Sequence, residues 1–200
     1  MAEQVAKLKK KQWYQITAPK QFDNIILGET LVYEPNAMLG KTLSHSLMNL
    51  INDNKKQNIN IHFKVIEIDG DKAKTAIMGY EIVPSSVKRY VRRSSKKISL
   101  SFNCETSDNV FLRVKPLIVT KANVKGSILS KLIDNATNLL TKAIKKISYE
   151  EFINELVSHK IQNAAKSTLN KIYPLKVCEI RYAGIELREK PQEVKAEVKE

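Results

Sequence analysis

Apolar residues recur at every second position from Ile59 to Val65, and polar residues fill the positions between them. A period of two predicts a strand with one buried face. The run continues to Asp69-Gly70-Asp71, a sequence typical of a hairpin turn. We therefore expect a hairpin whose second strand covers about residues 72–83 and ends before Pro84.

Apolar residues alternate again from Ile98 to Cys104 and from Val110 to Val114, on either side of a predicted turn at residues 105–109. We expect these two runs to pair as antiparallel strands of a largely closed sheet, because their alternation needs one shared buried face. Two shorter strands are predicted near the N-terminus. One covers residues 25–27 and ends at a turn at Gly28, and the other covers residues 31–33.

The period changes to that of a helix at about Gly126, where apolar residues recur every three or four positions over roughly six turns. Ser148 and Glu151 have the spacing of a capping box and predict the start of a second helix. A third helix is expected around 164–172, ended by Pro174, and a late strand around 177–185. Together these elements predict an α+β protein whose antiparallel core is flanked by C-terminal helices.

Charge narrows the choice of partners. The 200 residues include 34 Lys and Arg against 21 Asp and Glu, so the formal net charge is +13 and the sequence pI is about 9.6. Polyanions relieve the self-repulsion of such a charge, and nucleic acid and anionic membrane are the main candidates. Composition alone is also compatible with a soluble basic protein that has no particular partner.

Three parts are predicted along the chain. Residues 1–11 form a basic arm, with four lysines against one acid. Residues 12–187 form a single α+β domain, and residues 188–200 form a disordered, charged tail. The sequence starts without the apolar run of a signal peptide and has no stretch of about 20 apolar residues, so we expect a soluble, cytoplasmic protein.

The densest charge lies in residues 87–97, which contain six cations in a stretch without acids between Glu81 and Glu105. If this segment is helical, four of the cations share one face. An arginine guanidinium can donate two hydrogen bonds to one phosphate, which favours an RNA contact. The alternative is a solvated basic face, and Tyr90 could either pack inward or stack on a base. The four cations are Arg89, Arg92, Arg93 and Lys96, and Lys88 and Lys97 complete the cluster.

No pattern in the sequence indicates catalysis or a metal site. The three histidines lie in unrelated segments, and Asp69 and Asp71 flank a turn in which aspartate favours the turn itself. Cys104 and Cys178 belong to no Cys/His cluster of the zinc-binding kind, and two buried thiols are a simpler account than a disulfide. We therefore expect no enzymatic activity, no metal and no cofactor. The histidines are His45, His62 and His159.

Seven groups of short motifs stand in order over about residues 11–188. They are Lys11-Gln12-Trp13-Tyr14 with Ala18-Pro19 and Phe22, Gly28-Glu29-Thr30, Leu39-Gly40-Lys41, Val91-Arg92-Arg93, Leu112-Arg113-Val114-Lys115-Pro116, Ile172-Tyr173-Pro174-Leu175, and Glu179-Ile180-Arg181. In this order they resemble the archaeal and eukaryotic small-subunit ribosomal proteins of the S-three-A type, also called e-S-one.

The resemblance implies a β-barrel-like core flanked by helices, on the platform of the small subunit near the mRNA exit. It implies rRNA and neighbouring small-subunit proteins as partners, in cytoplasmic ribosomes, with no membrane and no small-molecule substrate. Together with the charge pattern, it gives the residues that we expect to bind RNA: Lys7, Lys9, Lys10, Lys11, Lys41, Lys88, Arg89, Arg92, Arg93, Lys96, Lys97, Arg113, Lys115, Lys121 and Lys125.

Two other functions stay open at this point. A basic adaptor could dock an acidic protein through its helical C-terminal part. Salt-sensitive co-purification with rRNA, rather than with one protein, would separate an RNA scaffold from such an adaptor. An RNA-processing enzyme has only its histidines and aspartates in its favour, and a nucleolytic assay on histidine variants would test it.

Overall fold

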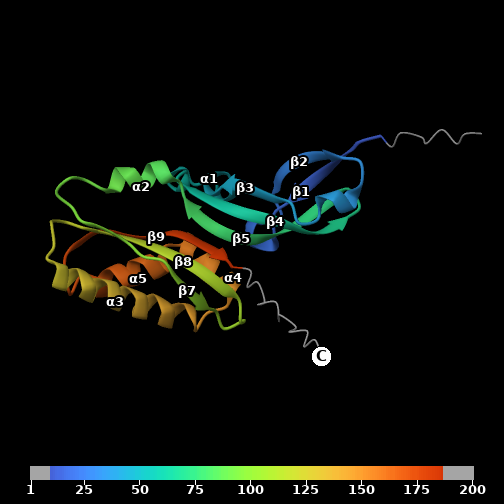
Figure 1. Cartoon of the computed structure of the whole chain (residues 1–200). Helices are drawn as coiled ribbons and strands as arrows, with labels where there is room; N and C mark the ends of the chain where they lie inside the picture. Colours follow the sequence, from blue (N-terminus) through green and yellow to red (C-terminus); the bar gives the residue numbers. More distant parts are fainter. Residues whose placement is uncertain (1–9, 187–200) are drawn as a thin grey trace, which may run out of the picture.

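Strands β4 (Ile59–Asp69) and β5 (Lys72–Ile82) form the long hairpin from which the rest of the sheet extends. The computed structural model describes residues 10–186, and Figure 1 shows their course. The hairpin turns at Gly70, whose φ of +57° lies in the left-handed region that glycine adopts without strain. Alternate residues of β4 from Ile59 to Val65 are buried, so the predicted hairpin is confirmed.

One edge of β5 is shared by two different strands. Its first residues pair in parallel with β1 (Gln12–Thr17), and its residues 79–81 pair antiparallel with β9 (Leu175–Ile185). The other edge of β5 pairs with β4. The sheet therefore leaves β5 in two directions, and the molecule has two ends of different build.

The first end contains β1, β2 (Ile26–Val32) and β3 (Thr42–Ser46), with β2 on β1 and β3 on β4. Gly28 lies inside β2 opposite Ile16, so the predicted turn at Gly28 is wrong. The two short strands are one strand, because a glycine lacks a side chain but keeps the backbone groups that the ladder needs. The short helices between these strands are η1 (Lys20–Phe22), η2 (Pro35–Met38), α1 (Leu47–Ile51) and η3 (Asn54–Lys56).

The second end is built on β8 (Phe111–Thr120), which pairs with β9 on one edge. Its other edge pairs with two short strands, β6 (Lys97–Ser99) and β7 (Phe102–Glu105), so the predicted strand from Ile98 to Cys104 is broken at residues 100–101. The break faces Pro116. The Leu100 N–H donates to the Pro116 carbonyl at 3.2 Å, but proline has no N–H to return the bond. The antiparallel pairing itself is confirmed.

The strand order is β2-β1-β5-β9-β8-β6, with β3 beside β4 and β7 beside β8. The α+β class is confirmed. The sheet is mixed rather than wholly antiparallel, because β1 and β5 run parallel. Within residues 10–186 no pairing joins its outer strands, so the expected barrel-like closure is not found. The sheet stays open because β1 and β9 both pair with the same edge of β5. They extend the sheet in two directions, so its strands do not close into one barrel.

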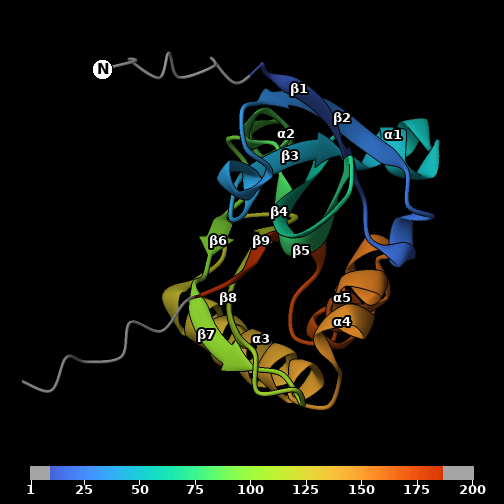
Figure 2. The same cartoon turned by 90° about the vertical axis from the view of Figure 1, so that its right-hand side faces the viewer.

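Helices α3 (Gly126–Ile144), α4 (Tyr149–Val157) and α5 (Lys160–Leu169) pack on the part of the sheet formed by β8 and β9 (Figures 1 and 2). The capping box of Ser148 and Glu151 is present at the start of α4, as predicted. Helix α5 begins earlier than predicted, directly after His159, and the late strand is confirmed as β9. Helix α3 buries Leu132, Ala136, Leu140 and Ile144.

Two groups of buried side chains stabilise the fold. The larger core lies between the helices and the sheet, and it includes Phe63, whose ring meets that of Phe22 edge to face at 6.0 Å. The smaller core lies among β1, β2 and the β4–β5 hairpin. It consists of Tyr14, Val32, Met38, Val65 and Ala73.

Both cysteines are buried and free, which agrees with the expectation of two thiols. Burial raises the pKa of Cys104 to about 11 and that of Cys178 to about 12. Neither side chain is therefore a thiolate near neutral pH, and neither is activated as a nucleophile.

Candidate nucleic-acid interface

Two of the six cations of residues 87–97 lie on the last turn of a short helix, α2 (Pro84–Tyr90), and the other four come after it. Val91 has extended backbone angles and ends the helix. The condition for a shared helical face of Arg89, Arg92, Arg93 and Lys96 is therefore not met, because only Arg89 is on the helix.

A serine explains the end of the helix. The Ser95 hydroxyl donates to the Arg92 carbonyl at 2.9 Å and accepts from the Arg92 N–H at 3.1 Å. These bonds satisfy the Arg92 N–H and carbonyl within the turn. The chain therefore turns here, where a longer helix would have placed several arginines on one face.

All six cations of this segment are exposed. None of them forms an ion pair with another residue in the range 10–186. Tyr90 is half-buried and packs against the larger core. Its ring therefore points inward in this structure and is not turned outward to stack on a base. Burial, with the negative charge of Glu179 as a second cause, raises the pKa of Tyr90.

Backbone hydrogen bonds bring two further loops to this segment. The Thr120 N–H donates to the Lys96 carbonyl at 3.0 Å, which brings the loop between β8 and α3 beside the cluster. The Lys121 N–H donates to the Pro174 carbonyl at 3.1 Å, which adds the loop between α5 and β9. Residues 84–97, 120–126 and 170–176 thus lie at the same end of the molecule.

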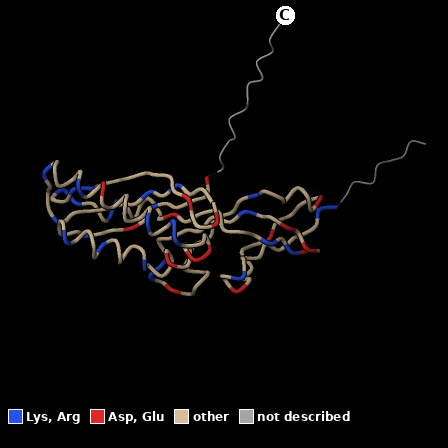
Figure 3. The backbone as a smooth tube through the Cα atoms, turned by 90° about the horizontal axis from the view of Figure 1, so that it is seen from below, with Lys and Arg blue, Asp and Glu red and all other residues tan. Residues whose placement is uncertain are grey.

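These three segments together contain ten cations and no acidic residue. We call this part of the molecule the basic end. Figure 3 shows it as the end where Lys and Arg outnumber Asp and Glu, at the left of the view. Its cations are Lys88, Arg89, Arg92, Arg93, Lys96, Lys97, Lys121, Lys125, Lys171 and Lys176.

Lys171 and Lys176 are the two residues of the basic end that were not among the expected RNA-binding residues. The Lys176 ammonium donates to the Tyr90 carbonyl at 3.3 Å, so it caps the C-terminal end of α2, where positive charge is favoured. In sequence both lysines are isolated and far from the cluster. Only the pairing of β9 with β8 brings them there.

Other expected RNA-binding residues lie elsewhere. Lys10, Lys11 and Lys41 are exposed at the opposite end of the molecule, where Lys11 lies 5.0 Å above the ring of Tyr33. Lys7, Lys9 and most of the predicted arm are outside the described residues, as is the predicted tail at 188–200. The structure therefore places Lys10, Lys11 and Lys41 apart from the basic end.

Arg113 and Lys115 form contacts within the protein. Arg113 forms an ion pair with Glu186 at 2.6 Å, and its Nε donates to Asn103 at 3.2 Å. The Lys115 ammonium lies 4.8 Å above the ring of Tyr182. These contacts join β7, β8 and the end of β9, so both cations help to hold these strands together.

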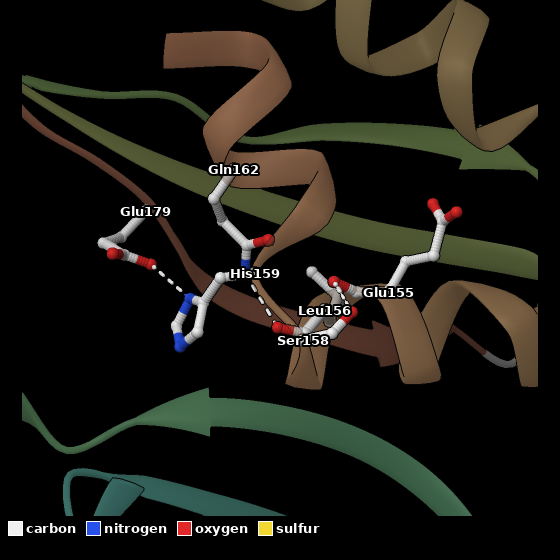
Figure 4. Close-up of polar contacts among 6 residues, drawn as sticks. All are labelled: Glu155, Leu156, Ser158, His159, Gln162 and Glu179. Atoms are coloured by element: carbon white, nitrogen blue, oxygen red, sulfur yellow. Dashed lines mark hydrogen bonds and ion pairs between the residues drawn. The ribbon is translucent and has the colours of Figure 1, made fainter. Parts of the chain in front are cut away.

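A turn of the helical layer supports β9 near the basic end. His159 links α4 to α5 with a φ of +57°, and its Nδ1 lies 3.5 Å from the Glu179 carboxylate on β9. Figure 4 shows the two groups pointing toward each other, and the Gln162 amide donating to the Leu156 carbonyl at 3.1 Å. His159, Glu179 and Tyr90 line a hollow of about 170 Å³. The turn therefore holds β9 in place behind the cluster.

The remaining histidines lie apart from this pair. His62 is on β4 beside Glu81 at 3.2 Å, and His45 is on β3. Within the described residues no three His, Cys, Asp or Glu side chains gather in a group that could hold a metal ion. No helix between residues 10 and 186 is long and apolar enough to cross a membrane.

These features define a basic α+β protein with an open mixed sheet and one end at which three acid-free segments bring ten cations together. A profile of the Ribosomal S3Ae family matches residues 2–187. The small ribosomal subunit protein eS1 of Haloarcula marismortui is 30% identical, over 94% of this chain and 87% of that protein. Those of Halorubrum lacusprofundi (31%, covering 94% and 86%) and Sulfurisphaera tokodaii (30%, covering 87% and 90%) are similar. The chain belongs to the ribosomal S3Ae family, as its motifs predicted, and this membership supports a structural, non-enzymatic role in the ribosome.

Proposed function

We propose that this protein is a structural constituent of the small ribosomal subunit and binds rRNA phosphates through the basic end. The relatives that share its sequence are named as proteins of that subunit. The proposal includes neighbouring small-subunit proteins as partners, in cytoplasmic ribosomes. It also includes a position on the platform near the mRNA exit, for which the family resemblance is the only support.

The observation that carries the RNA contact is the absence of acids from the three segments of the basic end. Ten cations that repel one another raise the free energy of the free protein, and a polyanion lowers it by neutralising them. The cations come from three separate segments of the chain, so the surface is broad and suits a folded RNA backbone more than a single groove. Arginine adds direction, because its planar group can hold one phosphate with two hydrogen bonds.

The test is the salt dependence of binding to purified small-subunit rRNA. Replacing Arg89, Arg92, Arg93 and Lys96 with alanine removes about four phosphate contacts. We expect the slope of log affinity against log salt to become shallower by roughly 3 to 4 units. All four side chains are exposed, so the circular dichroism spectrum should not change.

A control variant removes three exposed lysines from the last turn of α3 and the residues that follow it, at the end of this helix away from the basic end. Its binding slope should stay close to that of the natural protein. If the slope changes for this variant and not for the first, the RNA-binding surface lies on α3 and the proposal for the basic end is wrong. Sedimentation of the cellular protein with the small subunit in a sucrose gradient tests the wider role. The control variant replaces Lys142, Lys145 and Lys146.

A further inference from the structure

Three large apolar side chains are exposed together on the outer side of β1 and β2. Trp13 is 65% exposed, Tyr33 is 58% exposed and Leu31 is 41% exposed. Trp13 and Leu31 are direct partners across the two antiparallel strands, and Tyr33 follows β2 on the same side. We call Trp13, Leu31 and Tyr33 the aromatic patch. Figures 1 and 2 show β1 and β2 well away from the helical layer of α3.

Strand geometry explains why the patch faces solvent. Successive side chains of a strand point to opposite faces, and Tyr14 and Val32 point into the smaller core. Trp13, Leu31 and Tyr33 therefore point outward. None of the three side chains belongs to either core, so the fold does not require apolar residues at these positions.

The size of the patch favours a small ligand. The next cross-strand pair along the ribbon is polar, because the Gln15 amide donates to the Glu29 carboxylate at 3.4 Å. This pair separates the patch from Ile26 further along β2. A stable protein interface needs about 20–30 residues a side. Two aromatic rings and one leucine are instead enough for one or two flat ligands.

Positive charge lies beside the patch. The Lys11 ammonium is 5.0 Å above the Tyr33 ring, and Lys10 is exposed next to it. We propose that the aromatic patch binds unpaired RNA bases, which stack on Trp13 and Tyr33 while Lys10 and Lys11 contact the flanking phosphates. Stacking on aromatic side chains is the usual way in which proteins hold single-stranded nucleic acid. This inference rests on the proposed function, but it concerns bases and the end opposite the basic end.

Trp13 is the only tryptophan of the chain, so its fluorescence reports on the patch alone. The probe is a single-stranded oligouridylate of about eight nucleotides, within the usual site size. It is added to the full-length protein at low salt. We expect quenching of the tryptophan emission. An abasic oligonucleotide of the same length and charge should bind through the lysines without quenching.

Anisotropy of a labelled oligouridylate gives the affinity of the variants. Trp13→Ala should weaken binding about tenfold to a hundredfold, as expected for the loss of one stacked base. Trp13→Phe should bind almost as well as the natural protein, because it keeps an aromatic face. Both changes are at an exposed side chain, and so the fold should survive them.

The two RNA contacts can be separated. The alanine variant of Arg89, Arg92, Arg93 and Lys96 should keep the quenching even if its hold on rRNA is lost. Equal quenching by the abasic oligonucleotide, or unchanged affinity in Trp13→Ala, would overturn the stacking proposal whatever happens at the basic end. Quenching by an acidic peptide and not by RNA would also overturn it, in favour of a protein partner.

Discussion

The basic end and the end formed by β1, β2 and β3 differ in how their charged groups are paired. At the β1–β3 end, Lys74 forms an ion pair with Asp69 at 3.2 Å, and Lys11 lies over Tyr33. At the basic end ten cations come from segments without a single acid. Both ends contain exposed lysines, so the number of lysines does not distinguish them. They differ because the three segments of the basic end contain no acidic residue.

The two ends also differ in what lies beneath them. The basic end is carried by β8, β9 and the helices, over the larger core. The β1–β3 end contains the smaller core of five buried residues, contributes Leu27 to the larger core, and exposes the three side chains of the aromatic patch. Backbone hydrogen bonds at the basic end, such as that between Thr120 and Lys96, hold the three cationic segments together. At the β1–β3 end, the apolar side chains of the aromatic patch stay exposed to solvent.

The largest effect should come from the larger core. Phe63 is fully buried and contacts Phe22, so Phe63→Ala should lower the free energy of unfolding by about 3–5 kcal/mol. Phe102 on β7 is only half-buried, and Phe102→Ala should cost under about 2 kcal/mol. Urea unfolding of both variants measures the difference. Equal losses would mean that the edge strand is packed as tightly as the core.

The junction between the two ends gives an intermediate effect. A Cβ at Gly79 would lie 2.9 Å from the Ala183 carbonyl oxygen and 3.2 Å from the Gly184 Cα, so Gly79→Ala forces β5 and β9 apart. We expect a loss of about 1–3 kcal/mol, with hydrogen-exchange protection lowered first where these strands pair. Gly28→Ala is the control, because a Cβ there meets nothing within 4 Å. A stable Gly79→Ala variant would show that the ends can move independently.

The smallest effects are expected from replacing a single cation at each end, Arg93 at the basic end and Lys74 at the β1–β3 end. Arg93→Ala should make the salt slope of rRNA binding shallower by about 0.7–0.9 unit and leave stability within about 0.5 kcal/mol. Lys74→Ala should leave the slope unchanged and cost at most about 1 kcal/mol, the usual value of an exposed ion pair. The same titration and a thermal unfolding curve measure both. A slope that responds equally to both variants would remove the distinction between the ends.

Local patterns in the sequence determined the long elements of this protein. Alternation over Ile59–Val65 with an Asp-Gly turn gave the β4–β5 hairpin, and Ser148 with Glu151 gave the start of α4. These signals are reliable because each depends on neighbours in the chain. The density of cations in residues 87–97 was equally visible, since charge can be counted without a structure.

Tertiary structure alone decided how those elements combine. Nothing local shows that β1 and β9 share one edge of β5, which leaves the sheet open, or that Pro116 breaks the strand opposite it. The same holds for the charges. Lys176 joins the basic end through β9, while Arg113 is occupied by Glu186. A cation's role depends on which acids and carbonyls lie within a few ångströms, and pairing between distant strands sets those distances.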